Sequence, residues 1–458
     1  MKKNVLQSQR CLWVLLGGLL SVQVALAQIA TVGVTGFSAG PPRNVPLAFT
    51  PNGQPVVAYS DGAFSGKVVV QRFSAGIWNP VGSPTGISLG INFVQQVSLA
   101  INPANGDIFV AYKEGNNVYV QRWNGVVWGF VGAPLPSGSN GEISIALSPS
   151  GVPFVAYQSS PGIVVVQRCP AATWLPVGLP LSAGASSQPS LVFTPSGSGL
   201  YVAFVETGIG ITVKRFITGV WNLVGVSLGT PGIVSNPCLA FGAFPFPHVG
   251  YQEGPAIRVQ RFLFGWTVVG PPGFPGRVQT NTWLGVSQLG TPVAAYQDGT
   301  IKASVQHFSA GTWQILVGLG AFSSGLVEFP ALAFRPTNDN LYVSYRDIGL
   351  GPDRATVKRT TPAGRSLFLR EIAEEEPVGP YPNPIVGRSF YVPVDDAPNA
   401  RLNLTDLRGI SQPYWSVAES DKLIHVLLDA PLPPGIYLLR VAAPDTPDRL
   451  HKLLLTDQ

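Results

Sequence analysis

Six acidic residues recur at one place in a repeated pattern and are the first candidates for chemistry. Each lies two residues after an aromatic residue that ends an apolar run: Asp61, Glu114, Glu206, Glu253, Asp298 and Asp347. Four of them are followed by glycine, as in Asp61-Gly62, and this is typical of a hairpin turn because glycine tolerates positive φ. The six are therefore either turn residues or a rim of carboxylates that binds cations or ligand hydroxyl groups. They are our candidate binding residues.

Two further acids are the candidates for catalysis. Glu142 and Glu328 each precede the first apolar run of a repeat. A glycoside hydrolase needs two carboxylates about 5–9.5 Å apart around the scissile bond, so this pair would act only if loops brought it together. The sequence has no histidine cluster suited to a metal and no Gly-x-Ser-x-Gly motif. We expect no metal and no cofactor, and an enzymatic function is disfavoured but left open.

The acids belong to a unit that occurs seven times, with repeat intervals of 46 to 52 residues. Each unit has four short runs rich in β-branched and aromatic residues, separated by Gly, Pro and Asn. The second run ends as in Val57-Ala58-Tyr59, the third resembles VVVQRF at 68–73, and the fourth carries Trp-x-x-Val-Gly. Four strands in a unit of about 45–50 residues is the signature of a β-propeller blade.

The number of each run predicts how the ring closes. The first three runs occur seven times, but the tryptophan-bearing run occurs only six times, at Trp78, Trp128, Trp174, Trp221, Trp266 and Trp313. Thr31-Val32-Gly33 keeps the Val-Gly of that run and would supply the missing strand, which removes an exposed sheet edge. We predict an all-β chain in which residues 28–364 form a seven-bladed β-propeller with four-stranded blades, the N-terminal strand closing the last blade.

Composition agrees with this fold and excludes some functions. Only 12% of the residues are charged, against about a quarter in a typical globular domain, and 52 Gly with 43 Pro argue against a helical protein. Residues 28–364 hold 17 basic and 11 acidic side chains, and six of the basic ones are the evenly spaced arginines of the third run. Because they form no basic patch, we expect no nucleic-acid partner.

The N-terminus is predicted to be a secretory signal peptide, residues 1–27. A basic start, an apolar run over 11–22 and the cleavage motif Ala25-Leu26-Ala27 follow in the usual order. The run of roughly twelve residues is shorter than the ~20 that a membrane span needs. Cleavage would leave Cys169 and Cys238, which stand where other repeats have Phe or Ser, so we expect buried free thiols.

The C-terminal region has a different composition. Residues 365–378 are typical of a linker, and residues 379–458 contain short alternating runs that predict a small Ig-like β-sandwich. Four motifs follow in order: YPNP at 381–384, LTDLRG at 404–409, GIYLLRV at 435–441 and KLLL at 452–455. In order and spacing they resemble the C-terminal sorting domain of the type IX secretion system (Por secretion tail).

This resemblance implies an export route and a partner. The chain would cross the inner membrane by the Sec route and the outer membrane through the type IX secretion machinery. The residues that the resemblance assigns to the sorting signal are Tyr381, Pro382, Asn383, Pro384, Gly435, Tyr437, Lys452 and Leu453. The propeller repeats resemble uncharacterised repeats of secreted bacterial proteins, which carry no assigned activity.

The sequence therefore predicts a secreted or cell-surface protein that acts as a binding or adhesion module. Its extracellular ligand is unknown, a glycan and a protein being the two classes considered. One alternative is a secreted polysaccharide hydrolase or lyase built on the propeller, and another is a structural surface protein without a ligand.

Overall fold

Nearly every element of the protein is a β-strand. The computed structural model describes residues 29–456 apart from 139–141, 244, 264, 272–273, 276–281, 317–319, 350, 352, 361–379, 381–384, 387, 395–396, 398, 408, 421–422, 431 and 443–448. Within these residues the one helical element is the short 3-10 helix η1 (Gly62–Phe64), and none forms a helix long and apolar enough to cross a bilayer. The all-β prediction is confirmed, whereas the predicted signal peptide and linker lie outside the described residues.

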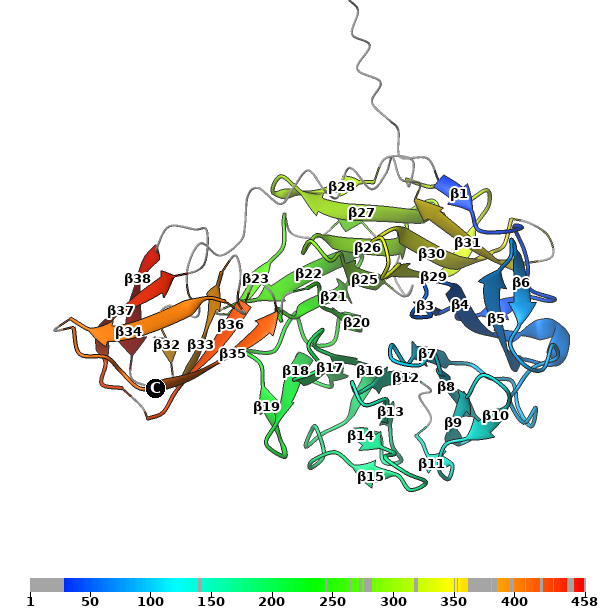
Figure 1. Cartoon of the computed structure of the whole chain (residues 1–458). Coiled ribbons are helices and arrows are strands. Elements are labelled where there is room, and N and C mark those ends of the chain that lie inside the picture. Colours follow the sequence, from blue (N-terminus) through cyan, green and yellow to red (C-terminus); the bar gives the residue numbers. More distant parts are fainter. Residues whose placement is uncertain are drawn as a thin grey trace, which may run out of the picture.

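Seven antiparallel sheets follow one another over residues 29–360 (Figure 1). Sheet 1 contains β2 (Pro42–Arg43), β3 (Leu47–Phe49), β4 (Pro55–Asp61), β5 (Lys67–Ser74) and β6 (Ile77–Pro80). Sheet 2 contains β7 (Val97–Ile101), β8 (Ile108–Glu114), β9 (Asn117–Trp123), β10 (Trp128–Phe130) and β11 (Leu135–Pro136). Sheet 3 contains β12 (Ile143–Leu147), β13 (Pro153–Gln158), β14 (Val164–Arg168) and β15 (Leu175–Pro176).

The other four sheets repeat this order. Sheet 4 contains β16 (Ser186–Phe193), β17 (Leu200–Glu206), β18 (Gly210–Ile217) and β19 (Val220–Leu223). Sheet 5 contains β20 (Val234–Ala240), β21 (His248–Glu253), β22 (Ala256–Phe262), β23 (Trp266–Val268) and β24 (Phe274–Pro275). Sheet 6 contains β25 (Trp283–Val286), β26 (Pro292–Gln297), β27 (Ala303–Ser309) and β28 (Thr312–Ile315). Sheet 7 contains β29 (Val327–Phe334), β30 (Leu341–Asp347), β31 (Arg354–Thr360) and β1 (Ile29–Thr31).

The second strand of a sheet is the most deeply buried, because both of its faces pack against neighbouring sheets. All seven residues of β4 are buried, and β-branched and aromatic side chains suit a strand covered on both faces. Tyr59 still needs a partner for its hydroxyl group, which Gln71 supplies through an Nε2 donor at 2.9 Å. Four other sheets repeat this bond, in the pairs Tyr112–Gln121, Tyr157–Gln167, Tyr251–Gln260 and Tyr296–Gln306.

The sheets are arranged radially, as in a β-propeller, with their first strands innermost (Figure 1). These inner strands contact one another in the order β3, β7, β12, β16, β20, β25 and β29, and β29 in turn contacts β3. The N-terminal β1 pairs with β31, placing Ile29 opposite Thr360. The predicted pairing of the N-terminal strand with the last sheet is therefore confirmed.

A tryptophan on the outer strand ties most sheets to the sheet before them. The Trp78 indole Nε1 donates to the Val32 carbonyl at 2.8 Å. Equivalent bonds of 2.7 to 2.8 Å join Trp128 to Val81, Trp221 to Val177, Trp266 to Val224 and Trp313 to Val269. Gly33 has φ +75°, and a Cβ there would come within 3.1 Å of Trp78 Cδ1. Because Val32 and Gly33 follow β1, this contact crosses the junction between sheets 7 and 1.

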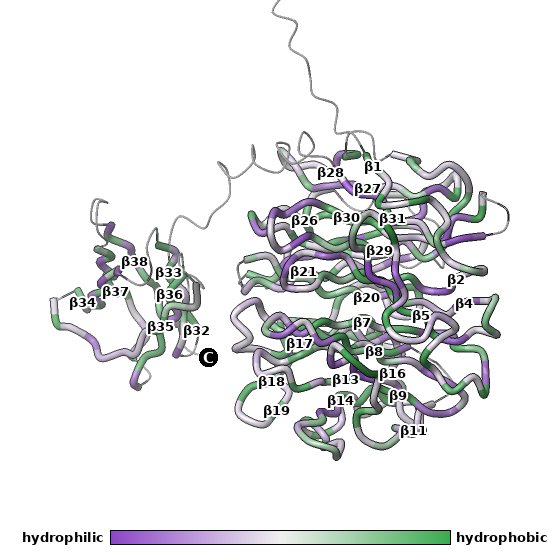
Figure 2. The backbone as a smooth tube through the Cα atoms, turned by 45° about the vertical axis from the view of Figure 1, so that its right-hand side comes forward, coloured by the Kyte–Doolittle hydropathy of each residue, from purple (hydrophilic) through white to green (hydrophobic). Residues whose placement is uncertain are grey.

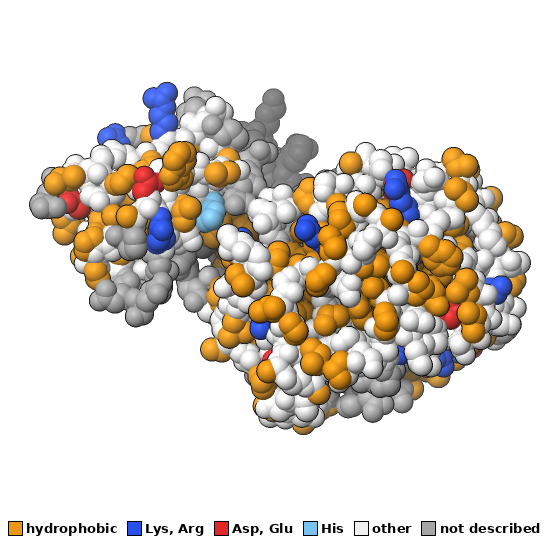
Figure 3. Space-filling model, turned by 90° about the horizontal axis from the view of Figure 1, so that it is seen from below, with side chains coloured by type: hydrophobic (Ala, Val, Ile, Leu, Met, Phe, Trp, Pro, Cys, Tyr) orange, Lys and Arg blue, Asp and Glu red, His pale blue; other side chains and the backbone are white. Residues whose placement is uncertain are grey.

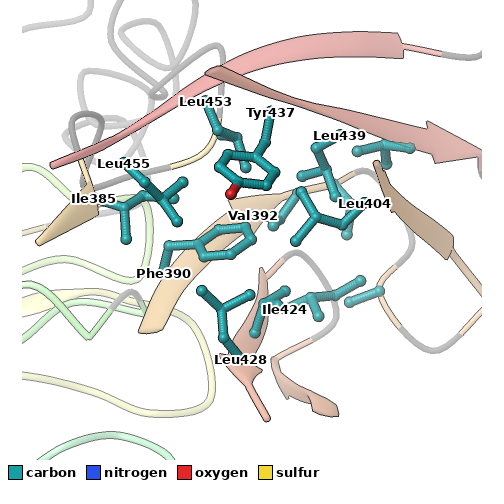
Figure 4. Close-up of a cluster of buried hydrophobic side chains, with 14 residues drawn as sticks. Ile385, Phe390, Val392, Leu404, Ile424, Leu428, Tyr437, Leu439, Leu453 and Leu455 are labelled. Atoms are coloured by element: carbon teal, nitrogen blue, oxygen red, sulfur yellow. The ribbon is translucent and has the colours of Figure 1, made fainter. Parts of the chain in front are cut away.

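The C-terminal region forms a separate β-sandwich of two sheets, visible as two layers in Figure 2. One sheet contains β32 (Ile385–Val386), β38 (Arg449–Thr456), β37 (Gly435–Ala442) and β34 (Arg401–Asp406). The other contains β33 (Ser389–Pro393), β36 (Leu423–Leu428) and β35 (Tyr414–Ser420). Both sheets contribute to one core, in which Phe390 and Leu428 face Leu439 and Leu453 (Figure 4).

The prediction of buried free thiols is confirmed in full for one cysteine and in part for the other. Cys169 and Cys238 are both free. Cys169 is buried, as expected, whereas Cys238 is partly exposed. The face seen in Figure 3 is dominated by hydrophobic and uncharged side chains with few charged ones among them. The low charge content is thus visible on this face of the molecule.

Candidate functional site

The six predicted rim acids lie at or next to the ends of the second strands, where their carboxylates bind nearby loops. Asp61 is fully buried and accepts from Ala39 N at 3.0 Å and Ala63 N at 2.9 Å. Burial raises the pKa of Asp61, although these backbone hydrogen bonds oppose the shift. Glu114 is likewise buried and accepts from Ile91 N at 2.6 Å.

Two further rim acids are held by side-chain and backbone donors. Glu253 accepts from Thr230 N and Thr230 Oγ1, both at 2.7 Å, and pairs with Arg258. Burial acts against the charged form of Glu253, but these partners outweigh it and lower its pKa. Asp298 has a lowered pKa in the same way, because hydrogen bonds within its turn, including Ser304 Oγ at 2.7 Å, outweigh the effect of burial.

The remaining two complete the pattern. Asp347 accepts from Gly349 N and Ser324 Oγ, each at 3.1 Å, and Glu206 accepts from Thr212 Oγ1 at 2.9 Å. These contacts agree with the interpretation of the six acids as residues that organise turns and loops. A ligand at these carboxylates would have to compete with bonds that are already made.

The two candidate catalytic acids lie in sheets that are not neighbours in the ring. Glu142 precedes β12 of sheet 3 and accepts from Gln188 Nε2 at 3.1 Å. Glu328 lies within β29 of sheet 7, not before the inner strand as the sequence indicated, because the strand continues through a bulge. Its carboxylate pairs with Arg346 at 2.8 Å. The structure therefore places the two acids in sheets that are not adjacent and gives their carboxylates different partners.

Several inner strands contain a bulge that the repeat pattern did not predict. The pairing register shifts between Ser187 and Ser190, between Ser235 and Cys238, and between Glu328 and Ala331. The first residue inside each bulge has a positive φ: 57° at Gln188, 52° at Asn236 and 52° at Phe329. Asn44, between β2 and β3 in sheet 1, has φ 45°. Non-glycine residues in this region cost about 1–3 kcal/mol each, and such strain clusters at functional sites.

Together with their equivalents in other sheets, these positions form a polar series along the inner strands. We call it the amide ring and define it as Asn44, Gln96, Glu142, Gln188 and Asn236, from sheets 1 to 5 in order. The equivalent residue of sheet 6 lies outside the described residues, and that of sheet 7 is Phe329. Asn44 is buried, and the other four are partly exposed.

Hydrogen bonds connect neighbouring members of the amide ring across sheet boundaries. Asn44 Nδ2 donates to Gln96 Oε1 at 3.2 Å. Gln188 Nε2 donates to Glu142 Oε1 at 3.1 Å, and Gln188 Oε1 accepts from Asn236 N at 2.8 Å. Asn44 and Gln96 therefore hold each other, and Gln188 is held by Glu142 and by the backbone of Asn236.

The amide ring carries almost no charge. Glu142 is its one ionisable member, and burial raises the pKa of this carboxyl group while the bonds from Gln188 oppose the shift. The side-chain amides of Gln96, Gln188 and Asn236 offer more donors and acceptors than the bonds within the ring use. Asn44 Nδ2, by contrast, already donates to Gln95 O at 2.6 Å and to Gln96 Oε1 at 3.2 Å. The ring can thus donate to and accept from an uncharged polar group, but it lacks the guanidinium and ammonium groups that hold an anion.

A second layer of contacts holds the inner strands beneath the ring. The hydroxyl oxygens of three serines accept from a backbone N–H of the next inner strand: Ser98 from Ile145, Ser144 from Leu191 and Ser190 from Leu239, at 2.9 to 3.1 Å. Cys238 continues the series, its sulfur accepting from Leu284 N at 3.4 Å. Burial raises the pKa of Cys238 to about 11, so this thiol acts as a packing group in the place of a serine.

The sequence contained a signal for the bulges that periodicity alone does not detect. Gln188-Pro189, Asn236-Pro237 and Phe329-Pro330 place proline inside an apolar run. Proline within a strand is confined to edges and bulges because it lacks the N–H donor of the ladder. A large residue directly before such a proline marks the place where the strand leaves its regular register.

The described part of the predicted sorting signal lies on two paired strands of the sandwich. Tyr437 faces Leu453 across β37 and β38, and both are buried in the core. Gly435 lies opposite Leu455, while Lys452 is exposed. Tyr381, Pro382, Asn383 and Pro384 lie outside the described residues.

Comparisons with known proteins add little to this geometry. No protein-family model matches the chain, and a search of curated proteins gave no match. Among solved structures, the SapL1 lectin in complex with α-methyl fucoside has a TM-score of 0.44 and 17% identity, covering 62% of this chain and 98% of the lectin. A six-bladed β-propeller lectin from Aleuria aurantia has a TM-score of 0.43 and 16% identity, covering 62% and 96%.

A third similar structure is a functionally unknown protein from Desulfotomaculum acetoxidans, with a TM-score of 0.44 and 16% identity, covering 60% of this chain and 86% of that one. All three TM-scores are below 0.5. The function of the present chain must therefore be argued from its own residues.

Proposed function

We propose that the chain is an exported binding protein in which the seven sheets are the blades of a closed seven-bladed β-propeller. The cyclic contacts of the inner strands support closure, and so does the Trp78–Val32 bond across the junction of sheets 7 and 1. In a ring closed in this way the first and last sheets are joined, so neither has a free sheet edge at this junction. Such a ring is a rigid platform for ligand contacts.

The observation that carries the binding function is the amide ring. The repeated residues of the sheets, such as the tryptophans and the Tyr–Gln pairs, are used to hold the fold together. The ring, by contrast, differs from sheet to sheet and sits on strained backbone at Asn44, Gln188 and Asn236. All of its members except Asn44 are partly exposed. Strained backbone of this kind clusters at functional sites, and the partly exposed side chains on it are available to a ligand.

The binding function can be tested with the full chain lacking residues 1–27. The immobilised protein is exposed to arrays of glycans and of extracellular proteins, with the heat-unfolded protein as control. We expect saturable binding to at least one component by the folded protein only. Absence of binding to every component, by a protein shown to be folded, would contradict the proposal and favour a purely structural role.

We also propose that the C-terminal sandwich is a type IX sorting domain and that residues 1–27 are a Sec signal. The support is the resemblance of the four motifs, together with a core that the sandwich makes from its own strands. Removal of 379–458 is expected to leave a folded propeller in the periplasm of a host that has the type IX machinery. Secretion of the truncated protein at the level of the full chain would refute this assignment.

A further inference from the structure

We propose that the amide ring and Phe329 bind the terminal sugar of an uncharged glycan chain, the ring contacting its hydroxyl groups and Phe329 its apolar face. This inference rests on the proposed binding function and names the class of ligand.

The chemistry of the ring selects for hydroxyl groups over ions. A hydroxyl group donates one hydrogen bond and accepts others, and the amides of Gln96, Gln188 and Asn236 likewise donate and accept. The ring contains no arginine or lysine, the side chains that bind an anion most strongly. A divalent cation prefers several carboxylates, and the ring contains only Glu142. A neutral polyhydroxylated ligand uses the donors and acceptors together.

The ring is also organised before binding. Asn236 N fixes Gln188 Oε1, and Gln188 Nε2 in turn fixes Glu142 Oε1. Side chains that are already ordered lose little conformational entropy when they bind, which favours affinity. The arc from Glu142 to Asn236 therefore spans three adjacent sheets with defined donor and acceptor positions.

The backbone conformation at position 329 does not explain why the residue there is phenylalanine. It occupies the bulge of sheet 7 with φ 52°, a conformation that Asn tolerates and that bulky residues avoid. Asn stands at the equivalent positions of sheets 1 and 5, with φ 45° and 52°. β29 contacts β3, so Phe329 comes from the sheet next to that of Asn44. Its side chain is partly exposed and provides an aromatic surface on this neighbouring sheet, suited to the C–H face of a sugar.

The first test is a titration of the full chain lacking residues 1–27 with neutral oligosaccharides. The probes are mannohexaose, maltohexaose and cellohexaose, with a hexamer of glucuronic acid as the charged comparison and any neutral glycan found on the array added to the set. Glu142→Gln and Asn236→Ala are each expected to weaken binding about ten-fold, the loss of one hydrogen bond to a ligand. Asn222→Ala is the matched control, since Asn222 is an exposed amide on the outer strand β19, and it should change affinity less than two-fold.

Phe329→Asn separates binding from folding. Asn relieves the strained φ, so this variant is expected to unfold at a temperature equal to or above that of the wild type, while it binds the neutral glycan about ten-fold more weakly. A loss of affinity in a protein that is no less stable cannot come from misfolding.

The outcomes separate this inference from the proposed function. Binding only of proteins or of charged glycans would overturn the inference while the binding function stands. Binding of a neutral glycan that Glu142→Gln, Asn236→Ala and Phe329→Asn all leave unchanged would also overturn it. Weakened binding in these variants, with Asn222→Ala unchanged, would confirm it.

Discussion

His248 gives the protein a specific sensitivity to acid that can be worked out from its surroundings. It lies in β21, is 4% exposed, and its Nε2 atom has no hydrogen-bond partner among the described residues. Burial lowers its pKa from 6.5 to about 3, and the nearby Arg261 charge acts in the same direction. Arg261 is its partner across the strands β21 and β22.

The sign of the effect follows from proton binding in the two states. Between pH 3 and 6.5 the unfolded chain binds a proton at this histidine and the folded protein does not. Stability is therefore complete above the unfolded pKa and is lost as the pH falls. A pKa lowered from 6.5 to about 3 corresponds to a loss of about 5 kcal/mol below pH 3, and of about 2 kcal/mol between pH 7 and pH 5.

His248→Phe isolates this contribution. Phe109 and Phe154 occupy the same position in sheets 2 and 3, so the fold accepts the side chain. We expect wild type to lose about 2 kcal/mol more unfolding free energy than the variant between pH 7 and pH 5, measured by urea unfolding followed by tryptophan fluorescence. His307 and His451, whose pKa values are lowered mainly by burial, are present in both proteins and cancel in the difference. Equal losses in the two proteins would refute the reasoning.

Three further predictions concern the ring and the sandwich. Trp78→Phe removes the bond to Val32 and is expected to lower the free energy of urea unfolding by about 1–2 kcal/mol more than Trp174→Phe does. The reason is that Trp174 Nε1 is buried without a hydrogen-bond partner among the described residues. Equal losses in the two variants would contradict the role of the bond. Gly33→Val places a side chain against the indole of Trp78, at a residue whose φ is positive. It should lower the melting temperature of the propeller by at least several degrees. An unchanged melting temperature would argue against closure at this junction. Phe390→Ala should destabilise the sandwich by about 3–5 kcal/mol and leave the propeller transition in calorimetry where it was; a shift of both transitions would show that the two regions do not unfold independently.

The repeat made much of the fold predictable from the sequence. The Val-Gly of 32–33 predicted that the N-terminal strand joins the last sheet, and the pairing of Ile29 with Thr360 confirms it. This worked because the same local phrase recurs with the same neighbours, so one missing copy could be located by elimination. The cysteines were interpreted correctly as free thiols for the same reason, since Cys238 stands where other sheets have serine.

The site was less predictable, because it depends on departures from the repeat. The rim acids were visible as a pattern, but the backbone donors that occupy Asp61 and Glu114 belong to loops without a repeated sequence. The amide ring was missed since Asn44, Gln96 and Gln188 share no single residue type. These positions can be recognised as equivalent only when the locations of the bulges in the inner strands are known.

The most direct test of the account is amide hydrogen exchange of the full chain, with and without the glycan or protein that it binds on the arrays. The account predicts that the ligand slows exchange in the segments around Asn44, Gln96, Glu142, Gln188 and Asn236, in several sheets at once. Protection confined to the outer strands or to the C-terminal sandwich would contradict it and place the ligand elsewhere.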